Sequence, residues 1–475
     1  MADTILTGLD GQQISVSAEQ VKDLSDRMQG SLLGTADQGY EDCRRIWNHM
    51  IDRRPGLIAM CESAEDVQHA VRFASEHGVL TAVCGGGHNV AGNAVCDGGI
   101  MVNLTRMKQA TVDPGARIAN VGPGCQLADL DRATQEHGLV APGGIISETG
   151  VAGLTLGGGF GWVSRKYGMT IDNLVSADVV TADGELLKAS STENADLFWG
   201  IRGGGGNFGV VTNFEFGLHP LGPEIYCGVI VFPFSEARQV LERYREFAAA
   251  APRELTVWAV TRKAPPLPFL PESVHGQLVQ IIAVAYAGDP AEGERLVAPV
   301  RGFGNAHGDH LGLAPFTAWQ SAFDGLQTAG VRNYWKSHNL DSVNDGIIDT
   351  VIEYIQQAPG DQCEIFLAQL GGAMAEVGAT DTAYHHRSTP FLMNVHTRWQ
   401  DASDDDRAVG WARSLFEAAA PHASGSVYVN FVSNEGRQRV QDAYPAETWD
   451  RLVSLKAKYD PRNLFRMNQN IPPQG

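Results

Sequence analysis

Three dense runs of glycine constrain this chain more than any other feature of its sequence. They lie at residues 85–87, 150–161 and 203–206, and they help to raise the glycine count to 54 of 475 residues, where an average share of about 7% would give roughly 33. Residues without a Cβ atom let the main chain approach a ligand closely and turn several N–H groups onto one anion. Three such runs in one α/β region predict loops around a ligand with a pyrophosphate and extended rings, such as a dinucleotide.

The third run also tests an alternative, the nicotinamide-binding Rossmann fold. Residues 204–209 match the pattern G-x-G-x-x-G, which binds a pyrophosphate when a helix follows and places its N-terminus against the phosphates. Here the next residues, 210–216, are rich in β-branched and aromatic side chains and predict a strand. A nicotinamide-dependent reductase is therefore the less favoured interpretation.

The hydrophobic pattern divides the chain into two regions. Up to Pro220 it predicts short strands and helices, including a helix between Ser63 and Gly78 and then a strand that leads into the first glycine run. The segment Pro220 to Pro223 resembles a domain boundary. Beyond it, longer apolar runs predict an antiparallel sheet with covering helices. These runs lie at residues 225–232, 255–260, 277–285, 365–370 and 391–395.

Length, charge and cysteine content narrow the class of protein. A chain of 475 residues exceeds the size at which one hydrophobic core stops growing, so two domains are expected. The net charge of -19 disfavours nucleic acid and membrane partners, and we see neither a signal peptide nor an apolar run long enough to span a bilayer. Seven cysteines without paired spacing suit a reducing, cytoplasmic location. No metal site is expected, because Cys84, His88 and Cys96 lack a fourth ligand and a recognisable spacing.

Four ordered motifs carry a resemblance to a known family. They are GGGHNVAG at 85–92, LTLGGGFG at 154–161, LFWGIRGGGGNFG at 197–209 and YDPRNLF at 459–465. Together they resemble the berberine bridge enzyme-like group of FAD-linked oxidases, and within it the bacterial branch similar to 6-hydroxy-D-nicotine oxidase. The resemblance implies an α+β fold of the PCMH or vanillyl-alcohol-oxidase type. Its FAD-binding domain would be split between residues 1–222 and 427–475, around an antiparallel-sheet substrate domain at 223–426.

The resemblance also implies which residues hold the cofactor. His88 matches the histidine that the family joins to the flavin 8α-methyl group. Members with a second, cysteinyl tether carry that cysteine where this chain has Ile146, so we expect one covalent bond. Cys84 replaces an arginine that often precedes the loop, and either an inert core thiol or a changed flavin environment would follow. The other residues expected to contact FAD are Gly85, Gly86, Gly87, Asn89, Gly92, Gly150, Gly153, Gly157, Gly158, Gly161, Val211, Tyr428, Asn430 and Asn468.

Tyr428 and Asn430 are also catalytic candidates. They match a Tyr-x-Asn-Tyr segment that lies beside the flavin in relatives. The last tyrosine of that segment acts as a base in some relatives, but here it is Phe431, which cannot accept a proton.

A second group of candidates comes from the residues themselves. Tyr334, Lys336 and His338 alternate in a probable strand and so share one face. They are candidates for the substrate cleft, with Lys336 or His338 as the base if its pKa is lowered; an exposed strand face is the equal alternative. His396 and Arg398 also share a strand face, and for them a structural role is favoured.

The leading functional expectation is an FAD-dependent oxidase. It would take a hydride from a small molecule that bears a hydroxyl or amine and use molecular oxygen as acceptor, giving hydrogen peroxide. A flavin dehydrogenase with another acceptor, and a flavoprotein cyclase, isomerase or binding module without redox turnover, stay open. A homodimer is also left open.

Overall fold

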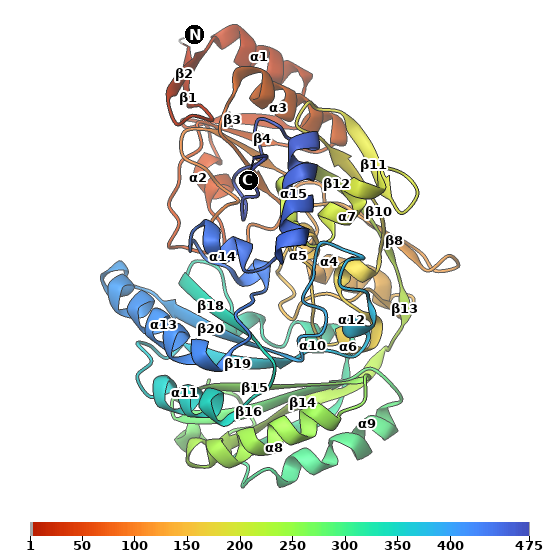
Figure 1. Ribbon diagram of the computed structural model, residues 1–475, viewed down its shortest axis with the longest axis vertical. Coiled ribbons are helices and arrows are strands. Elements are labelled where there is room, and N and C mark those ends of the chain that lie inside the picture. Colours follow the sequence, from red (N-terminus) through yellow and green to blue (C-terminus); the bar gives the residue numbers. More distant parts are fainter. Residues whose placement is uncertain (1–2, 475) are drawn as a thin grey trace.

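The molecule has two halves along its longest axis, as the computed structural model of residues 3–474 shows (Figure 1). One half contains the N-terminal elements and the helix α15 (Ala446–Tyr459), although these lie at opposite ends of the chain. The other half is built on a single large sheet with helices outside it. The mixture of helices, small sheets and one antiparallel sheet is the α+β class that the sequence predicts.

A four-stranded sheet leads the chain into the first glycine run. Its strands, in spatial order, are β3 (Ser31–Gly34), β4 (Leu57–Met60), β6 (Ile100–Asn103) and β5 (Thr81–Cys84). The helix α3 (Ala64–His77) connects β4 to β5, and it begins where the Ser63 hydroxyl accepts a hydrogen bond from the Asp66 N–H. The predicted helix before the glycines is thus confirmed. Because β5 ends at Cys84, the glycines begin at the carboxyl end of a buried strand.

A five-stranded antiparallel sheet carries the third glycine run. Its spatial order is β11 (Leu186–Ser190), β10 (Leu174–Val180), β12 (Val210–Gly217), β8 (Ile118–Val121) and β7 (Ala110–Asp113). The strand β12 follows directly after Gly209, so the glycine pattern at 204–209 opens a strand rather than a helix. This arrangement lacks the helix N-terminus that the Rossmann fold needs.

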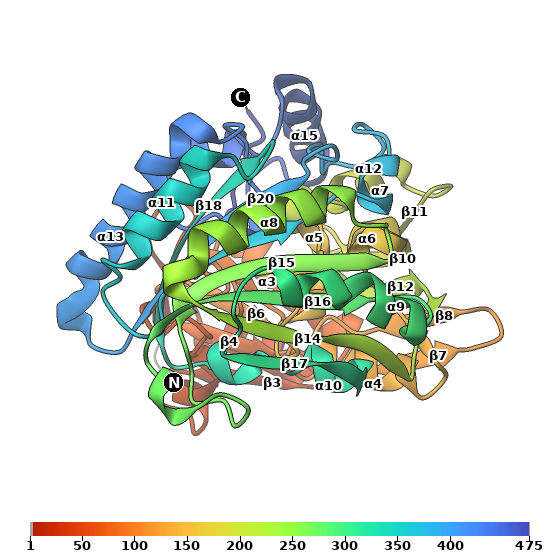
Figure 2. The same cartoon turned by 90° about the horizontal axis from the view of Figure 1, so that it is seen from below.

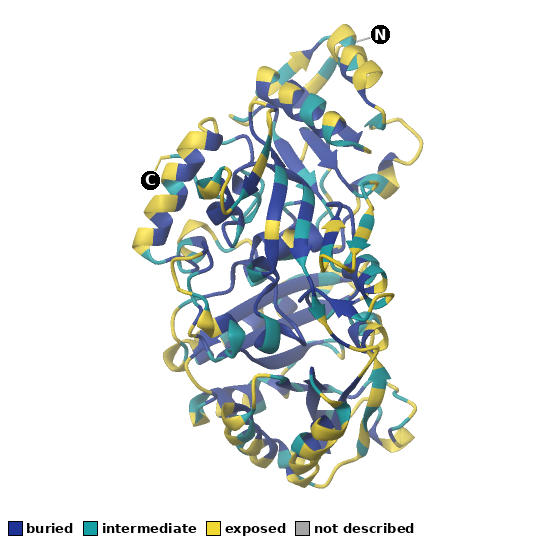
Figure 3. Cartoon of the chain, turned by 90° about the vertical axis from the view of Figure 1, so that its right-hand side faces the viewer, coloured by how far each residue is buried: buried dark blue, intermediate teal, exposed yellow. Residues whose placement is uncertain are grey.

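The second half is a seven-stranded antiparallel sheet. Its spatial order is β17 (Gly308–Pro315), β14 (Glu224–Pro233), β16 (Leu278–Tyr286), β15 (Leu255–Lys263), β19 (Glu364–Gln369), β20 (Phe391–Trp399) and β18 (Arg332–Leu340). The helices α8 (Ala237–Ala250), α11 (Asp345–Ile355) and α13 (Asp405–Ala419) cover its outer face (Figure 2). In Figure 3 the helices at the lower end of the molecule are largely yellow toward solvent, while the strands next to them are mainly dark blue. Its inner face is therefore free to form a wall against the N-terminal half.

After the large sheet the chain returns to the N-terminal half. There Lys456 and Asp460 form a fully buried ion pair, 2.6 Å between Nζ and Oδ2, and Lys456 also donates to the carbonyl oxygen of Asn207 at 2.7 Å. The Asn207 side chain in turn accepts a hydrogen bond from the Ile471 N–H at 3.1 Å. These contacts join the tail to the third glycine run. The split at 222 and 426 remains a prediction, but the chain crosses between halves near both positions.

The described residues were also compared with the requirements of a membrane-spanning helix, a metal site and a disulfide bond. No helix within residues 3–474 has the length and apolar character needed to cross a membrane. The same residues contain no cluster of three or more His, Cys, Asp or Glu side chains placed to hold a metal ion. All seven cysteines are free thiols, and all but Cys43 are buried.

Candidate active site

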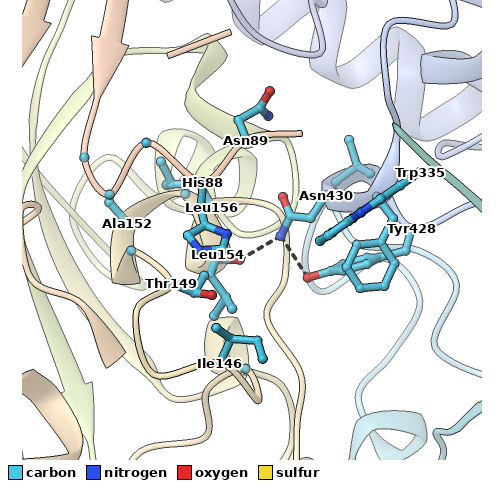
Figure 4. Close-up of a pocket in the computed structure, with 18 of the residues that line it drawn as sticks. His88, Asn89, Ile146, Thr149, Ala152, Leu154, Leu156, Trp335, Tyr428 and Asn430 are labelled. Carbon is cyan, nitrogen blue, oxygen red and sulfur yellow. Dashed lines mark hydrogen bonds between the residues drawn. The ribbon is translucent and has the colours of Figure 1, made fainter. Parts of the chain in front are cut away.

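A cavity lies between the N-terminal half and the inner face of the seven-stranded sheet (Figure 4). One side is lined by residues of all three glycine runs and by the tail residues 467–469. The opposite side is lined by side chains from β15, β16, β19 and β20. The site is therefore built from segments that are distant in sequence, and it is completed only where the two halves meet.

The first and second glycine runs cross each other in the cavity wall. A Cβ atom on Gly86 would lie 2.5 Å from the Cα of Gly150, and one on Gly150 would lie 2.6 Å from the nitrogen of Gly86. Glycine is required at both positions because two main chains touch there. A Cβ on Gly153, by contrast, would meet no atom within 4 Å, so Gly153 presents bare main chain to the cavity.

Most of the residues predicted to contact a cofactor line this cavity. They are Gly85, Gly86, Gly87, His88, Asn89, Gly150, Gly153, Val211, Tyr428, Asn430 and Asn468.

Four predicted glycines lie behind the cavity wall instead. Gly157 packs directly on the side chain of Asn430, Gly158 packs against Tyr428, Gly161 packs on the carbonyl of Gly143, and Gly92 packs on Ile51. Contact between protein segments is enough to explain their lack of a side chain, and the expectation that they contact the cofactor stays a prediction.

His88 is held as a neutral imidazole in the cavity wall. Its ring stacks on Trp47, with 4.4 Å between centroids and 21° between planes. Burial, together with the nearby positive charge of Arg398, lowers its pKa to about 3. Its Nε2 atom is buried and has no hydrogen-bond partner among the described residues. A buried nitrogen atom without a partner lowers the stability of the fold unless a further group bonds to it.

Hydrophobic side chains surround the His88 imidazole. Figure 4 shows Leu154 and Leu156 beside it and Ile146 on the same side of the cavity. Ile146 thus lies in the wall, at the place where a second tether would need a thiol. Cys84 is buried outside the lining, and burial raises the pKa of its thiol to about 12, so the thiol stays neutral.

Tyr428 and Asn430 form a hydrogen-bonded pair against the second glycine run (Figure 4). The Tyr428 oxygen accepts hydrogen bonds from the Gly159 N–H and from Asn430 Nδ2, both at 2.8 Å. Asn430 Nδ2 also donates to the carbonyl of Leu154 at 3.0 Å. Burial raises the pKa of Tyr428, so the phenol keeps its hydrogen and acts as a donor rather than a base.

Tyr334, Lys336 and His338 do share one face of β18, as predicted, but it is the face away from the cavity. Lys336 forms an ion pair with Glu435, and the His338 ring stacks on Phe416 of α13. Side chains alternate along a strand, so the residue that reaches the cavity is the intervening Trp335 (Figure 4). The expectation that these three side chains line the substrate cleft is corrected.

The sequence analysis named His396, with a structural role favoured, but missed the two charged residues that form a cluster with it in the sheet wall. Arg262, Glu364 and His396 lie side by side on β15, β19 and β20, where they are register partners, and all three line the cavity. Glu364 forms an ion pair with Arg262, and its Oε1 atom is 2.9 Å from His396 Nδ1. Gln327 Nε2 donates to Glu364 Oε1 at 3.0 Å. These residues could have been noticed in the sequence because they are polar or charged side chains inside otherwise apolar predicted strands.

The charges within this cluster are set by burial and by each other. Burial alone would raise the pKa of Glu364, but Arg262 and the hydrogen bond from His396 lower it to about 2. Burial lowers the pKa of His396 even though Glu364 acts in the opposite direction. The cluster therefore pairs an ionised carboxylate with a neutral imidazole at neutral pH, and that imidazole can accept a proton.

Two family models match segments of the chain that contribute residues to the cavity lining. Residues 55–190 match the family model described as "FAD binding domain", and residues 427–472 match the one described as "Berberine and berberine like". An FAD-linked oxidoreductase of Dictyostelium discoideum is 29% identical and aligns over 98% of this chain and 99% of its own.

A second relative and a solved structure agree with this result. The (R)-6-hydroxynicotine oxidase of Paenarthrobacter nicotinovorans is 29% identical over 94% of this chain and 98% of its own. The crystal structure of 6-hydroxy-D-nicotine oxidase from Arthrobacter nicotinovorans superimposes with a TM-score of 0.84 at 27% identity, over 94% of this chain and 98% of that one. The two-domain PCMH-type fold and an FAD cofactor are thereby confirmed. Over nearly its whole length the chain is similar to FAD-linked oxidoreductases of the berberine bridge enzyme-like group, and it carries both an FAD-binding and a berberine-like domain.

Proposed function

We propose that the protein is an FAD-dependent oxidase that transfers a hydride from a small substrate bearing a hydroxyl or amine and uses oxygen as the electron acceptor, releasing hydrogen peroxide. One observation carries the proposal: the glycine-lined wall with His88 faces a wall that holds a neutral imidazole, His396, beside an ionised carboxylate. A redox cofactor on one side and a proton acceptor on the other are what oxidation of an alcohol or amine requires.

The residues of the glycine-lined wall fit FAD. Bare main chain at Gly153 leaves room for a close approach, and the buried Nε2 atom of His88 has no partner of its own. When bound, FAD supplies a two-electron acceptor for a hydride. His88 would hold it by a single covalent bond, because a neutral imidazole nitrogen is a nucleophile and Ile146 offers no second one.

Two side chains orient the reacting groups from the cofactor side. Tyr428 keeps its hydrogen because burial raises the pKa of its phenol, and so it can donate to a substrate oxygen or nitrogen. Asn430 fixes the direction of that phenol and joins the tail to the carbonyl of Leu154. Neither side chain takes up a proton in this proposal.

His396 would take the proton that leaves the substrate hydroxyl or amine. Its Nδ1–H would donate to the Glu364 carboxylate at 2.9 Å. Its Nε2 atom would take up the proton in place of the hydrogen bond that it accepts from Asn394 Nδ2, 2.8 Å away. The carboxylate favours the protonated ring once a proton arrives. Trp335 stacks on the imidazole at 4.2 Å between centroids and keeps the ring from turning.

The covalent bond is tested by the intact mass of the denatured protein. The wild type should carry the added mass of one FAD, and His88→Ala should lose it. His137→Ala, a change at an exposed histidine, should keep it. Release of all yellow colour from the wild type on acid precipitation would contradict the tether.

The acceptor is tested by reducing the enzyme with substrate without oxygen and then admitting air. Rapid return of the oxidised flavin spectrum with one peroxide formed per turnover is the expected result. Reoxidation only by an added dye would instead indicate a dehydrogenase. Product formation with neither peroxide nor added acceptor would indicate a cyclase or isomerase.

A further inference from the structure

Aromatic rings from both halves of the molecule gather in one part of the cavity lining. Four of them, which we call the aromatic wall, line the cavity and touch one another: Phe160, Trp258, Phe366 and Phe431. The Trp258 and Phe366 rings are nearly parallel, at 14° with 5.7 Å between centroids. The Phe431 ring stands at 89° to Phe366 and at 70° to Phe160. The wall therefore offers both flat faces and ring edges to a bound molecule.

The space around these rings is filled by further apolar side chains. Val260 and Ile281 line the cavity from β15 and β16, and Ala283 keeps the wall open beside them. The polar group of the Trp258 side chain, its Nε1–H, already donates a hydrogen bond to the carbonyl of Gln369 at 3.2 Å. Phe431 adds a ring without a hydroxyl, at the position where the resemblance would place a tyrosine. This part of the cavity therefore presents few hydrogen-bonding side chains to a ligand that carries many hydroxyl groups.

The polar groups of the sheet wall are already bonded to one another. Glu364 accepts from Arg262, Gln327 and His396. Gln327 accepts from Arg398 at 2.7 Å. An oligosaccharide brings many hydroxyls into a site, and each one that is buried without a partner weakens binding. The sheet wall has a single polar patch, so it can satisfy one or two such groups rather than many.

We propose that the substrate is a compound with a flat aromatic ring system and one reacting hydroxyl or amine, bound with its rings on the aromatic wall and its polar group at His396, rather than an oligosaccharide. The proposal rests on the proposed function in that it concerns the same cavity. Aromatic pairs with offset or edge-to-face geometry strengthen binding by about 2- to 12-fold beyond the area that they bury. The aromatic wall therefore favours a ring over an aliphatic body of the same size.

Binding to the FAD-loaded enzyme tests this class directly and does not require turnover. The aromatic probes are 4-hydroxybenzyl alcohol and 4-hydroxybenzylamine, and the sugar probes are xylobiose and cellobiose. Tryptophan fluorescence and the flavin absorption band report binding. We expect an at least 10-fold lower Kd for the aromatic probes. Equal or tighter binding of either disaccharide, or no binding of either aromatic probe, overturns the proposal.

A matched pair of variants tests the wall itself. Phe366→Leu removes a ring of the aromatic wall, and Phe391→Leu removes a ring from the same sheet on its opposite face, where Phe391 packs against Tyr244. Phe366→Leu should raise the Kd of the aromatic probes about 3- to 10-fold and leave that of the disaccharides unchanged. Phe391→Leu should change neither. Equal losses in both variants overturn the assignment of the wall.

The two proposals fail in different ways. Tight binding of the aromatic probes without peroxide from any substrate would refute the oxidase and keep the substrate class. Peroxide released with disaccharides and not with the aromatic probes would keep the oxidase and refute the substrate class.

Discussion

Replacing Tyr428 by phenylalanine should destabilise the protein by more than the loss of one hydroxyl group normally does. The Tyr428 oxygen accepts two hydrogen bonds, from the Gly159 N–H and from Asn430 Nδ2. Asn430 keeps its bond to the Leu154 carbonyl when the hydroxyl is removed. The Gly159 N–H is buried and would be left without an acceptor.

The size of the effect follows from these two losses. A buried donor without a partner costs about 1–3 kcal/mol, and the second hydrogen bond contributes about 1 kcal/mol. The free energy of unfolding should therefore fall by about 2–4 kcal/mol. Tyr244→Phe is the matched control, because this buried hydroxyl makes one hydrogen bond, to the carbonyl of Leu367 at 2.9 Å. Its loss should cost about 1 kcal/mol.

Two measurements check the prediction. Urea unfolding of both variants should show the larger loss in Tyr428→Phe, and hydrogen exchange read by mass spectrometry should speed up in the peptide that contains Gly159. The reasoning is refuted if Tyr244→Phe loses as much stability as Tyr428→Phe, or if exchange at Gly159 does not change.

Three further predictions follow from the structure. Burial raises the pKa of Asp131 to about 7, so between about pH 4 and pH 7 the native state keeps a proton that the unfolded state gives up. The free energy of unfolding should therefore fall as the pH rises through this range. Asp131→Asn should remove this pH dependence and raise the melting temperature at about pH 8 relative to the wild type. Gly86→Ala should prevent stable folding because its Cβ meets main chain at 2.5 Å, whereas Gly153→Ala should fold with a melting temperature near that of the wild type, since its Cβ meets open space. Burial lowers the pKa of His396 below 6.5, so kcat/KM should fall only in acid below that pH as the imidazole takes up a proton, and His396→Gln should abolish the acid limb; an unchanged profile in that variant would remove His396 from the mechanism.

The strands and helices could largely be predicted because each leaves a periodic pattern in the sequence. The buried strands of the large sheet appear as apolar runs, and the helix after Ser63 has both a capping residue and a glycine at its end. The strand β17 was not predicted. It lies at the edge of the sheet, where its residues are partly buried or exposed without regular alternation and include polar side chains and two glycines, so its apolar pattern is weak.

The candidate site could be predicted only where one short segment carries it. His88, Tyr428 and Asn430 belong to local motifs. Alternation along β18 shows that Lys336 and His338 share a face, but which face meets the cavity depends on where α13 packs.

The charged cluster is harder still to predict. Arg262, Glu364 and His396 become neighbours through the register of three strands, and no local pattern encodes that register. The glycines show a related limit: sequence shows that a side chain is excluded, whereas only the structure shows whether a ligand or another segment excludes it.

The return of the tail to the third glycine run has a consequence for the order of assembly. Tyr428, Asn430 and Asn468 belong to the last tenth of the chain to be synthesised, and the loop at Asn207 depends on Lys456 and Ile471 for its hydrogen bonds. While these residues are still inside the ribosome, the nascent chain has the His88 loop but lacks the tail residues that complete the cavity lining. We therefore expect a complete flavin-binding cavity to form only after the tail has left the ribosome and packed on the third glycine run.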